Sequence, residues 1–232
     1  MSWQAQKDLV RSVSLPLSGG SPSRDWIAVV RGGKRPHRWS LYVLLKRTTQ
    51  GLAVVCAFPF ALLCCFGRNA FTYTLFAEMF ALAPGTPGSL WRAAFYKLTL
   101  HDCSIDIVVG FGSFFSRRQV SVGANVSIGS YCIIGPAKIG ARTQISSHVE
   151  IPGARQHSRN EHGRLSDSSD APNAFVTIGS DCWIGASAIV MADVGAQSTI
   201  GAGSVVVKDI PARVVAVGSP AKPVQTRESA KE

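Results

Sequence analysis

The chain has 232 residues, a formal net charge of +10 and a hydrophobic content of 46%. This length has room for one main domain and an appendage, which excludes an assembly of several large domains. The first fifty residues hold nine Lys or Arg against Asp8 and Asp25, so seven (9 − 2) of the ten excess positive charges lie there.

Residues 1–50 form the first predicted segment. Glycine and proline recur along it, at Gly19, Gly20, Pro22, Gly32, Gly33 and Pro36. This composition favours a flexible basic arm over a second core. Such an arm suits either a nucleic acid or an anionic membrane surface. The apolar region that follows favours the membrane surface, and we expect no nucleic-acid partner.

Residues 51–104 are expected to form an apolar and helical region with two apolar runs, 51–66, which has no charge, and 71–83. Neither run reaches the ~20 apolar residues of a spanning helix. Pro59 would kink the first run, and Arg68 between the runs would be costly at the bilayer centre. We expect no signal peptide, because the first run begins fifty residues into the sequence. Two readings remain: helices that pack on the next domain, or a membrane-associated element in the cytoplasmic leaflet.

A short helix is expected from about Ser89, with Ser89 as its N-cap. Its apolar face would cover the open end of the next domain, as terminal caps of solenoids must. That face comprises Leu90, Ala93, Ala94, Tyr96, Leu98 and Leu100.

A repeat of six residues organises the rest of the chain, which we place at 105–223 with a polar tail at 224–232. Aliphatic residues recur at Val122, Ile128, Ile134, Ile139, Ile145, Ile151, Ile178, Ile184, Val190, Val194, Ile200 and Val206. The residue two positions earlier is always small, and glycine usually follows. Val109-Gly110 and Phe115-Ser116 resemble two earlier, less regular repeats.

This register predicts a solenoid of short strands. Residues i and i−2 face the same side of a strand, so the aliphatic and the small residue both point inward, and the glycine permits a tight corner. A helix is excluded because an aliphatic every six residues drifts around its surface. A β-sandwich is the alternative, but its strands vary in length and its turns do not repeat at fixed offsets.

The repeats resemble those of the hexapeptide-repeat acyltransferases, whose fold is the left-handed parallel β-helix. The run Asp181-Cys-Trp-Ile-Gly-Ala and the segments 200–211 and 215–222 are similar to the C-terminal signature of galactoside- and maltose-type acetyltransferases. The overall pattern is most like acetyltransferases of exopolysaccharide and lipopolysaccharide biosynthesis. The resemblance implies a mainly β fold, a homotrimer, acetyl-CoA as acyl donor and no required metal.

The polar insertion 152–175 breaks the repeat and contains His157 and His162. In the resembled family a loop from this place carries the catalytic histidine. By its distance from Ile151 and Trp183, His157 matches that histidine, and His162 is the second choice. A neutral imidazole would accept the proton of the acceptor hydroxyl. No serine or cysteine beside a base indicates a nucleophile, so direct transfer is expected.

The resemblance also implies the donor site, in a groove between two β-helices. Trp183 and Ala186 would flank the pantetheine, and Ala202 would offer backbone contacts. Lys208 and Lys222 would face the CoA phosphates, which suits their charge.

The acceptor implied by the resemblance is a hydroxyl of a sugar, a glycan precursor or a lipid-linked saccharide. Together with the apolar region, this suggests a cytoplasmic protein that is peripheral on the inner face of the cytoplasmic membrane. One alternative is a γ-carbonic-anhydrase-like metalloenzyme, with His157 and His162 as ligands and His148 as the nearest third. The other is a non-catalytic membrane-bound scaffold.

Six cysteines are present, and none of them shows the paired spacing of a metal site. Cys132 and Cys182 occupy the small position of their repeats. We therefore expect them to be buried, reduced thiols.

Overall fold

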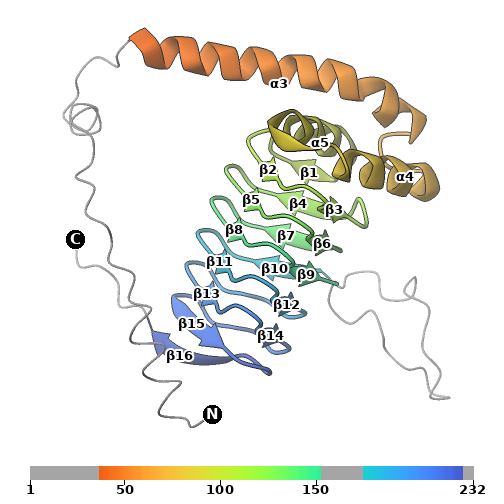
Figure 1. The fold of residues 1–232 in the computed structure, drawn as a ribbon. Coiled ribbons are helices and arrows are strands. Elements are labelled where there is room, and N and C mark those ends of the chain that lie inside the picture. The colour runs from red at the N-terminus through yellow and green to blue at the C-terminus, as the bar shows by residue number, and fades with distance from the viewer. Residues whose placement is uncertain (1–36, 153–174, 227–232) are drawn as a thin grey trace, which may run out of the picture. The chain divides into compact units, whose positions relative to one another are not determined.

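The computed structural model describes residues 37–152 and 175–226. The chain forms two units, Met1–Arg47 and Thr48–Glu232. Three helices precede the strands: α3 (His37–Leu63), α4 (Ala70–Ala81) and α5 (Gly85–Thr99). In the second unit, α4 and α5 lie across the end of a stack of short strands (Figure 1).

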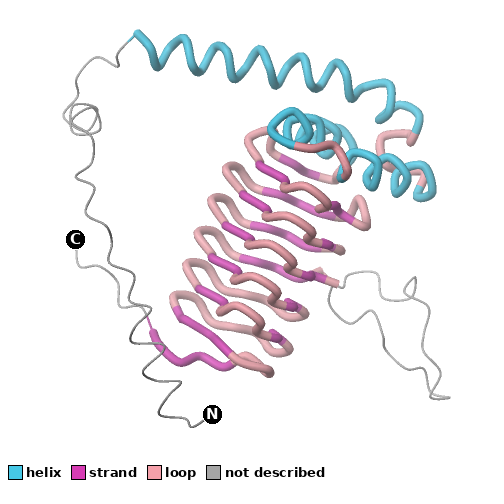
Figure 2. The backbone as a smooth tube through the Cα atoms, in the orientation of Figure 1, coloured by secondary structure: helices cyan, strands magenta, loops and turns pink. Residues whose placement is uncertain are grey.

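The strands form three sheets, drawn as three columns of short arrows in Figure 1 and as magenta segments in Figure 2. Sheet A contains β1 (Asp102–Cys103), β4 (Val120–Val122), β7 (Ala137–Ile139) and β10 (Val176–Ile178). Sheet B contains β2 (Val108–Val109), β5 (Ser127–Ile128), β8 (Gln144–Ile145), β11 (Trp183–Ile184), β13 (Thr199–Ile200), β15 (Val214–Val217) and β16 (Lys222–Thr226). Sheet C contains β3 (Phe114–Phe115), β6 (Ile133–Ile134), β9 (Glu150–Ile151), β12 (Ile189–Val190) and β14 (Val205–Val206).

Each turn of the chain visits sheets A, B and C in order, and every pairing between turns is parallel except that of β15 with β16. The bridges Ile178↔Val194 and Val194↔Ile210 continue sheet A beyond β10. Five turns are complete, because sheet C has five strands. The predicted fold class is confirmed: a mainly β parallel solenoid with N-terminal helices, consistent with the left-handed β-helix.

The core follows the predicted register. All twelve aliphatic residues of the repeat are at most 3% exposed, and so are Val109 and Phe115 of the earlier turn. Of the small positions two residues earlier, only Ala192 is not fully buried. Departures from the six-residue period share one place, the corner between sheets C and A: the short steps 134–139 and 190–194 and the insertion after Pro152 all lie there.

The glycines lie at the corners as predicted, but for a different reason. Left-handed backbone occurs instead three residues before the aliphatic, for example at Asn125 (φ 59°) and Asp181 (φ 58°). A Cβ added to Gly123 would lie 2.6 Å from the backbone nitrogen of Ala141 in the next turn. Glycine is therefore needed because successive turns approach each other closely there.

The helices α4 and α5 close the first turn, as the sequence predicts for a cap. The guanidinium of Arg92 is buried and donates to the carbonyls of Phe80, Ala81, Ala83 and Val109. These bonds satisfy the last carbonyls of α4 and tie both helices to β2. Tyr73 donates its hydroxyl to the carbonyl of Phe115 at 3.0 Å.

Ser89 is not the N-cap of α5. The helix begins at Gly85 after Pro84, and the Ser89 Oγ accepts the backbone N–H of Val109 at 3.2 Å. The hydroxyl is used by the solenoid because the first turn has no earlier turn to satisfy that N–H.

Two elements extend across boundaries that the sequence analysis drew. Helix α3 begins at His37, inside the predicted arm, because the stretch after Pro36 contains good helix formers and no glycine before Gly51. The predicted tail after Pro223 still pairs with β15 as far as Thr226. The division into arm, apolar region, solenoid and tail otherwise stays a prediction.

Pro59 lies inside α3, where a kink was expected. Among the described helices, none combines the length and the hydropathy needed to cross a bilayer.

Candidate functional site

The predicted catalytic residues, His157 and His162, lie outside the described residues. The insertion leaves the solenoid after β9, at Pro152, and returns at Phe175 before β10. Lys138 on β7 holds its Nζ 5.6 Å from the centre of the Phe175 ring. The described ends thus anchor the insertion at the corner between sheets C and A, in the middle of the solenoid.

Trp183 stands on the outer face of sheet B. It lies between Gln144 of the preceding turn and Thr199 of the following one, and its side chain is 51% exposed. Its Nε1–H donates to the Oγ of Ser146 at 3.2 Å. The indole is therefore held by a polar contact while about half of its side chain is exposed, and its contact with the pantetheine stays a prediction.

Ala186 and Ala202 occupy the same position in successive turns, at the corner between sheets B and C. Both are exposed, and the N–H of Gly203 donates to the carbonyl of Ala186 at 2.8 Å. Ala186 follows β11, the strand that carries Trp183, and Ala202 follows β13 in the next turn. The solenoid therefore brings three of the five predicted donor residues to one edge.

The two predicted lysines do not join that edge in one chain. Lys208 follows β14, at the opposite end of the sheet C strand from Ala202. Lys222 opens β16 and pairs with Val217 at the last turn. Both side chains are exposed.

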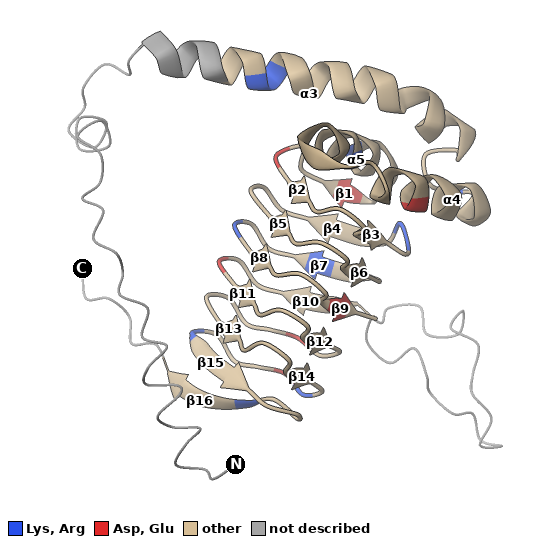
Figure 3. Ribbon diagram, in the orientation of Figure 1, with Lys and Arg blue, Asp and Glu red and all other residues tan. Residues whose placement is uncertain are grey.

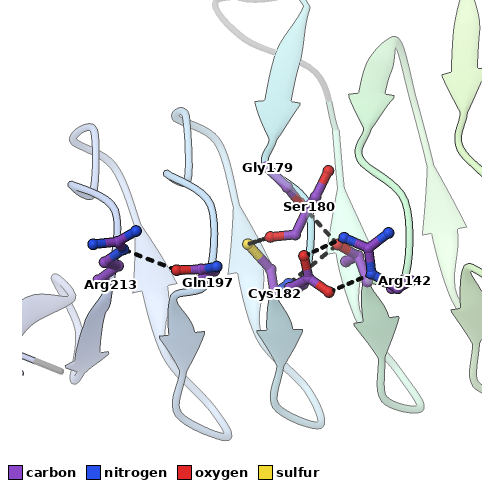
Figure 4. Close-up of polar contacts among 8 residues, drawn as sticks. Arg142, Gly179, Ser180, Cys182, Gln197 and Arg213 are labelled. Atoms are coloured by element: carbon purple, nitrogen blue, oxygen red, sulfur yellow. Dashed lines mark hydrogen bonds and ion pairs between the residues drawn. The ribbon is translucent and has the colours of Figure 1, made fainter. Parts of the chain in front are cut away.

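A polar column that the sequence analysis missed runs along the corner between sheets A and B (Figure 4). Arg142 donates Nε–H and Nη2–H to the two carboxylate oxygens of Asp181, each at 2.6 Å. Arg213 donates to the Oε1 of Gln197 at 2.9 Å. The four residues share a left-handed backbone conformation at the same corner of successive turns. This corner position was not identified from the sequence, and its residues are neighbours in space although they are sixteen or more positions apart in sequence.

The Arg142–Asp181 pair lies at the surface, with side chains 60% and 36% exposed. The hydrogen bonds from Arg142 lower the pKa of the Asp181 carboxyl, and the same bonds raise the pKa of Arg142. Screened pairs of this kind contribute little to stability.

Cys132 and Cys182 are buried as predicted, and burial raises the pKa of both thiols. A thiol with a raised pKa is a poor nucleophile at neutral pH. This supports direct transfer over a covalent intermediate on these residues.

His148, the nearest third ligand of the carbonic-anhydrase alternative, stacks on Tyr131 with ring centres 5.4 Å apart. Within residues 37–152 and 175–226 no group of three His, Cys, Asp or Glu side chains is placed to hold a metal. The other two proposed ligands, His157 and His162, are outside these ranges, so the alternative stays untested.

Comparisons with known proteins agree with this architecture. The family model described as the hexapeptide repeat of succinyl-transferase matches residues 175–208, which include β10 to β14. Residues 175–208 are thus similar to a hexapeptide repeat. No curated protein matches it in sequence.

Solved structures are similar to this chain well beyond the matched segment. A maltose O-acetyltransferase from Clostridium difficile 630 is similar with a TM-score of 0.58 and 24% identity, over 68% of this chain and 86% of that one. A hexapeptide-repeat-containing acetyltransferase from Vibrio cholerae is similar with a TM-score of 0.53 and 19% identity, over 71% of this chain and 92% of that one. At these identities the likeness concerns the fold.

Proposed function

We propose that this protein is an acetyl-CoA-dependent O-acetyltransferase that acts on a hydroxyl of a sugar or glycan precursor. The observation that carries the proposal is the exposed edge of Trp183, Ala186 and Ala202, in the turns that match the hexapeptide-repeat model. The names of the two similar structures, both acetyltransferases, support the reaction class. The name of the first supports a sugar acceptor.

In the proposed reaction, His157 takes the proton from the acceptor hydroxyl as its oxygen attacks the thioester carbonyl. The carbon–sulfur bond then breaks, and the CoA thiolate leaves and takes the proton held by His157, which restores the neutral imidazole. A neutral imidazole suits this task because its pKa lies near the working pH. Trp183 would hold the pantetheine arm, and Lys208 and Lys222 would face the phosphates of CoA.

The donor site is proposed to be shared between neighbouring chains of a homotrimer. Lys208 lies at the far end of sheet C from Ala202, so one chain alone does not surround a ligand that touches both. The outward residues of sheet C are mostly apolar: Phe114, Ile133, Ile189 and Val205, with Glu150 as the exception. Ile133 is exposed and the other three are partly exposed, and an apolar face of this kind is suited to self-association.

The protein is further proposed to lie on an anionic membrane surface. From Thr48 onward α3 buries small residues, such as Ala53, Ala57 and Ala61, and exposes large ones, such as Leu52 (66%) and Val55 (68%). Phe71 of α4 is 79% exposed. This is the reverse of a water-facing helix, and Figure 3 shows mostly uncharged residues along α3, α4 and α5.

The acyltransferase proposal is tested by mass spectrometry of the cell's glycans with and without the protein. We expect one glycan class to lose the mass of an acetyl ester when the protein is absent, and to regain it when the parent gene is restored. A gene that encodes the Trp183→Ala protein should restore the acetylation only weakly. Glycans of unchanged acetylation in all three strains would contradict the proposal.

The membrane proposal is tested by sedimentation with phosphatidylglycerol vesicles. Leu52→Ser combined with Val55→Ser should abolish the sedimentation of the parent protein, whereas the exposed Val108→Ser on sheet B should not change it. Surface variants are preferable to deletion of residues 1–83, because that deletion would remove Tyr73 and three of the four carbonyl partners of Arg92. A parent protein that never sediments would overturn this part.

A further inference from the structure

An apolar pocket of about 310 Å³ opens between the three helices. Cys56 and Phe60 of α3, Met79 and Phe80 of α4, Ala83 after α4 and Trp91 of α5 line it. None of these side chains carries a charge, and the indole nitrogen of Trp91 is their one polar side-chain nitrogen or oxygen. We call it the helical pocket. It lies at the capped end of the solenoid and is separate from the edge of Trp183, Ala186 and Ala202.

The walls of the helical pocket are held in place by aromatic contacts. Phe60 packs edge-to-face on Phe76 and on Phe80, with ring centres 5.3 Å apart in both cases. Phe80 contacts Trp91 in the same way at 6.5 Å. Because each ring is oriented by another, the pocket is preformed, and the small Ala83 leaves space that a larger side chain would fill.

The opening of the pocket is apolar as well. Met79 is 51% exposed and Trp91 is 45% exposed, while each also lines the pocket. The large exposed side chains of α3 and α4 continue this surface. A ligand that enters here passes from an apolar surface into an apolar cavity, which suits a hydrocarbon chain and gives a polar group no partner.

Size and charge narrow the occupant. A dry cavity of roughly 150 Å³ holds one benzene, so the helical pocket has room for a chain of roughly ten carbon atoms. Between Thr48 and Thr99 the sequence has one acidic residue, Glu78, against the exposed cations Arg68 and Lys97, while the third cation, Arg92, is buried among carbonyls. This balance complements an anionic head group.

We propose that the helical pocket binds one acyl chain of an anionic phospholipid drawn from the membrane surface. This inference rests on the membrane part of the proposed function and is independent of acetyl transfer. An acyl chain in the pocket adds the burial of its methylenes to the surface contact of the helices. The occupied pocket would thereby anchor the capped end of the solenoid to one lipid molecule.

The exposed thiols give a matched pair of reporters. Cys56 lines the pocket, whereas Cys65 is exposed and does not. Maleimide labelling is measured on a Cys65→Ser protein, which reports Cys56, and on a Cys56→Ser protein, which reports Cys65. The probe is decanoate in monomeric form, with acetate as the control that lacks the chain.

We expect decanoate to slow the labelling of Cys56 at least fivefold and to leave that of Cys65 unchanged, and we expect acetate to slow neither. In a protein with Ala83→Leu, which narrows the pocket, the protection of Cys56 should be lost. Equal slowing of both thiols, slowing of neither, or full protection in the Ala83→Leu protein would overturn the pocket assignment.

The lipid source is tested separately by phosphate analysis of the protein after extraction from membranes. About one phospholipid per chain should remain with the parent protein, and less than a fifth of that with Ala83→Leu. Decanoate protection without any retained phospholipid would overturn the phospholipid assignment. None of these readouts uses acetyl transfer, so a failure of the enzymatic proposal is recognised independently.

Discussion

Hydroxyl groups in the small inward positions connect successive turns of the solenoid. The Oγ1 of Thr143 donates to the carbonyl of Gly179 at 2.8 Å and accepts the N–H of Cys182 at 3.2 Å. Ser198 makes the same pair of bonds, to Pro211 and from Val214. These hydroxyls therefore satisfy buried backbone groups at the corners, where the strand ladder is interrupted.

Replacement of Thr143 by valine measures how much these hydrogen bonds contribute to the free energy of unfolding. The shape of the side chain is retained, but one buried carbonyl and one buried N–H lose their partner, so the free energy of unfolding should fall by about 2–4 kcal/mol. The exposed Thr177→Val on β10 is the control and should change it by less than about 0.5 kcal/mol. Denaturant titration measures both, and equal stability of the two variants would refute this role.

The small size of these positions could be predicted from the sequence, because inward residues alternate with outward ones along a strand. Their hydrogen-bond partners could not. Each partner lies in the next turn, and the length of the corner between sheets C and A decides which residue that is. The insertion places Gly179 thirty-six residues after Thr143, a separation that no local pattern contains.

At the scale of the elements, the corners contain two kinds of position: glycines that lie close to the next turn, and residues with left-handed backbone. One pair of variants distinguishes them. Gly123→Ala should destabilise the solenoid by about 1–3 kcal/mol, because the new Cβ would meet the backbone of Ala141. Gly203→Asn should be tolerated within about 0.5 kcal/mol, because its backbone is left-handed (φ +67°), open space surrounds it, and Asn125 occupies the matching position of another corner. Thermal unfolding gives both values; a stable Gly123→Ala protein would show that the turns can move apart.

The sequence predicted that helices cap the solenoid, but it did not predict the hydrogen bonds that hold them there. The apolar face of α5 indicated a cap, and its buried Ala93, Ala94 and Tyr96 confirm it. Burial of Arg92 could not be inferred, because a guanidinium enters a core only where carbonyls from several segments converge, and here they come from α4, the turn after it and β2. Ser89 was misassigned because cap preferences are local, whereas the N–H of Val109 that it serves lies twenty residues away.

For the whole molecule, the apolar outer side of sheet C predicts the assembly. Light scattering should give a trimer of about 74 kDa (3 × 24.7 kDa) for the parent protein and a monomer for Ile133→Lys, whose side chain is 43% exposed on that face in one chain. Ser121→Lys on the outer side of sheet A should remain a trimer. A parent protein that is a clean monomer and still transfers acetyl groups would refute the shared donor site.

Turnover of paired histidine variants tests the central claim most directly. With acetyl-CoA and the cell's saccharide precursors, His157→Ala should lower the rate of CoA release roughly 10²- to 10⁴-fold while the affinity for acetyl-CoA stays within a few-fold, and His162→Ala should cost much less. An inactive His162→Ala beside an active His157→Ala would move the base to His162 and keep the reaction class. Full activity of both variants would contradict the histidine-base mechanism.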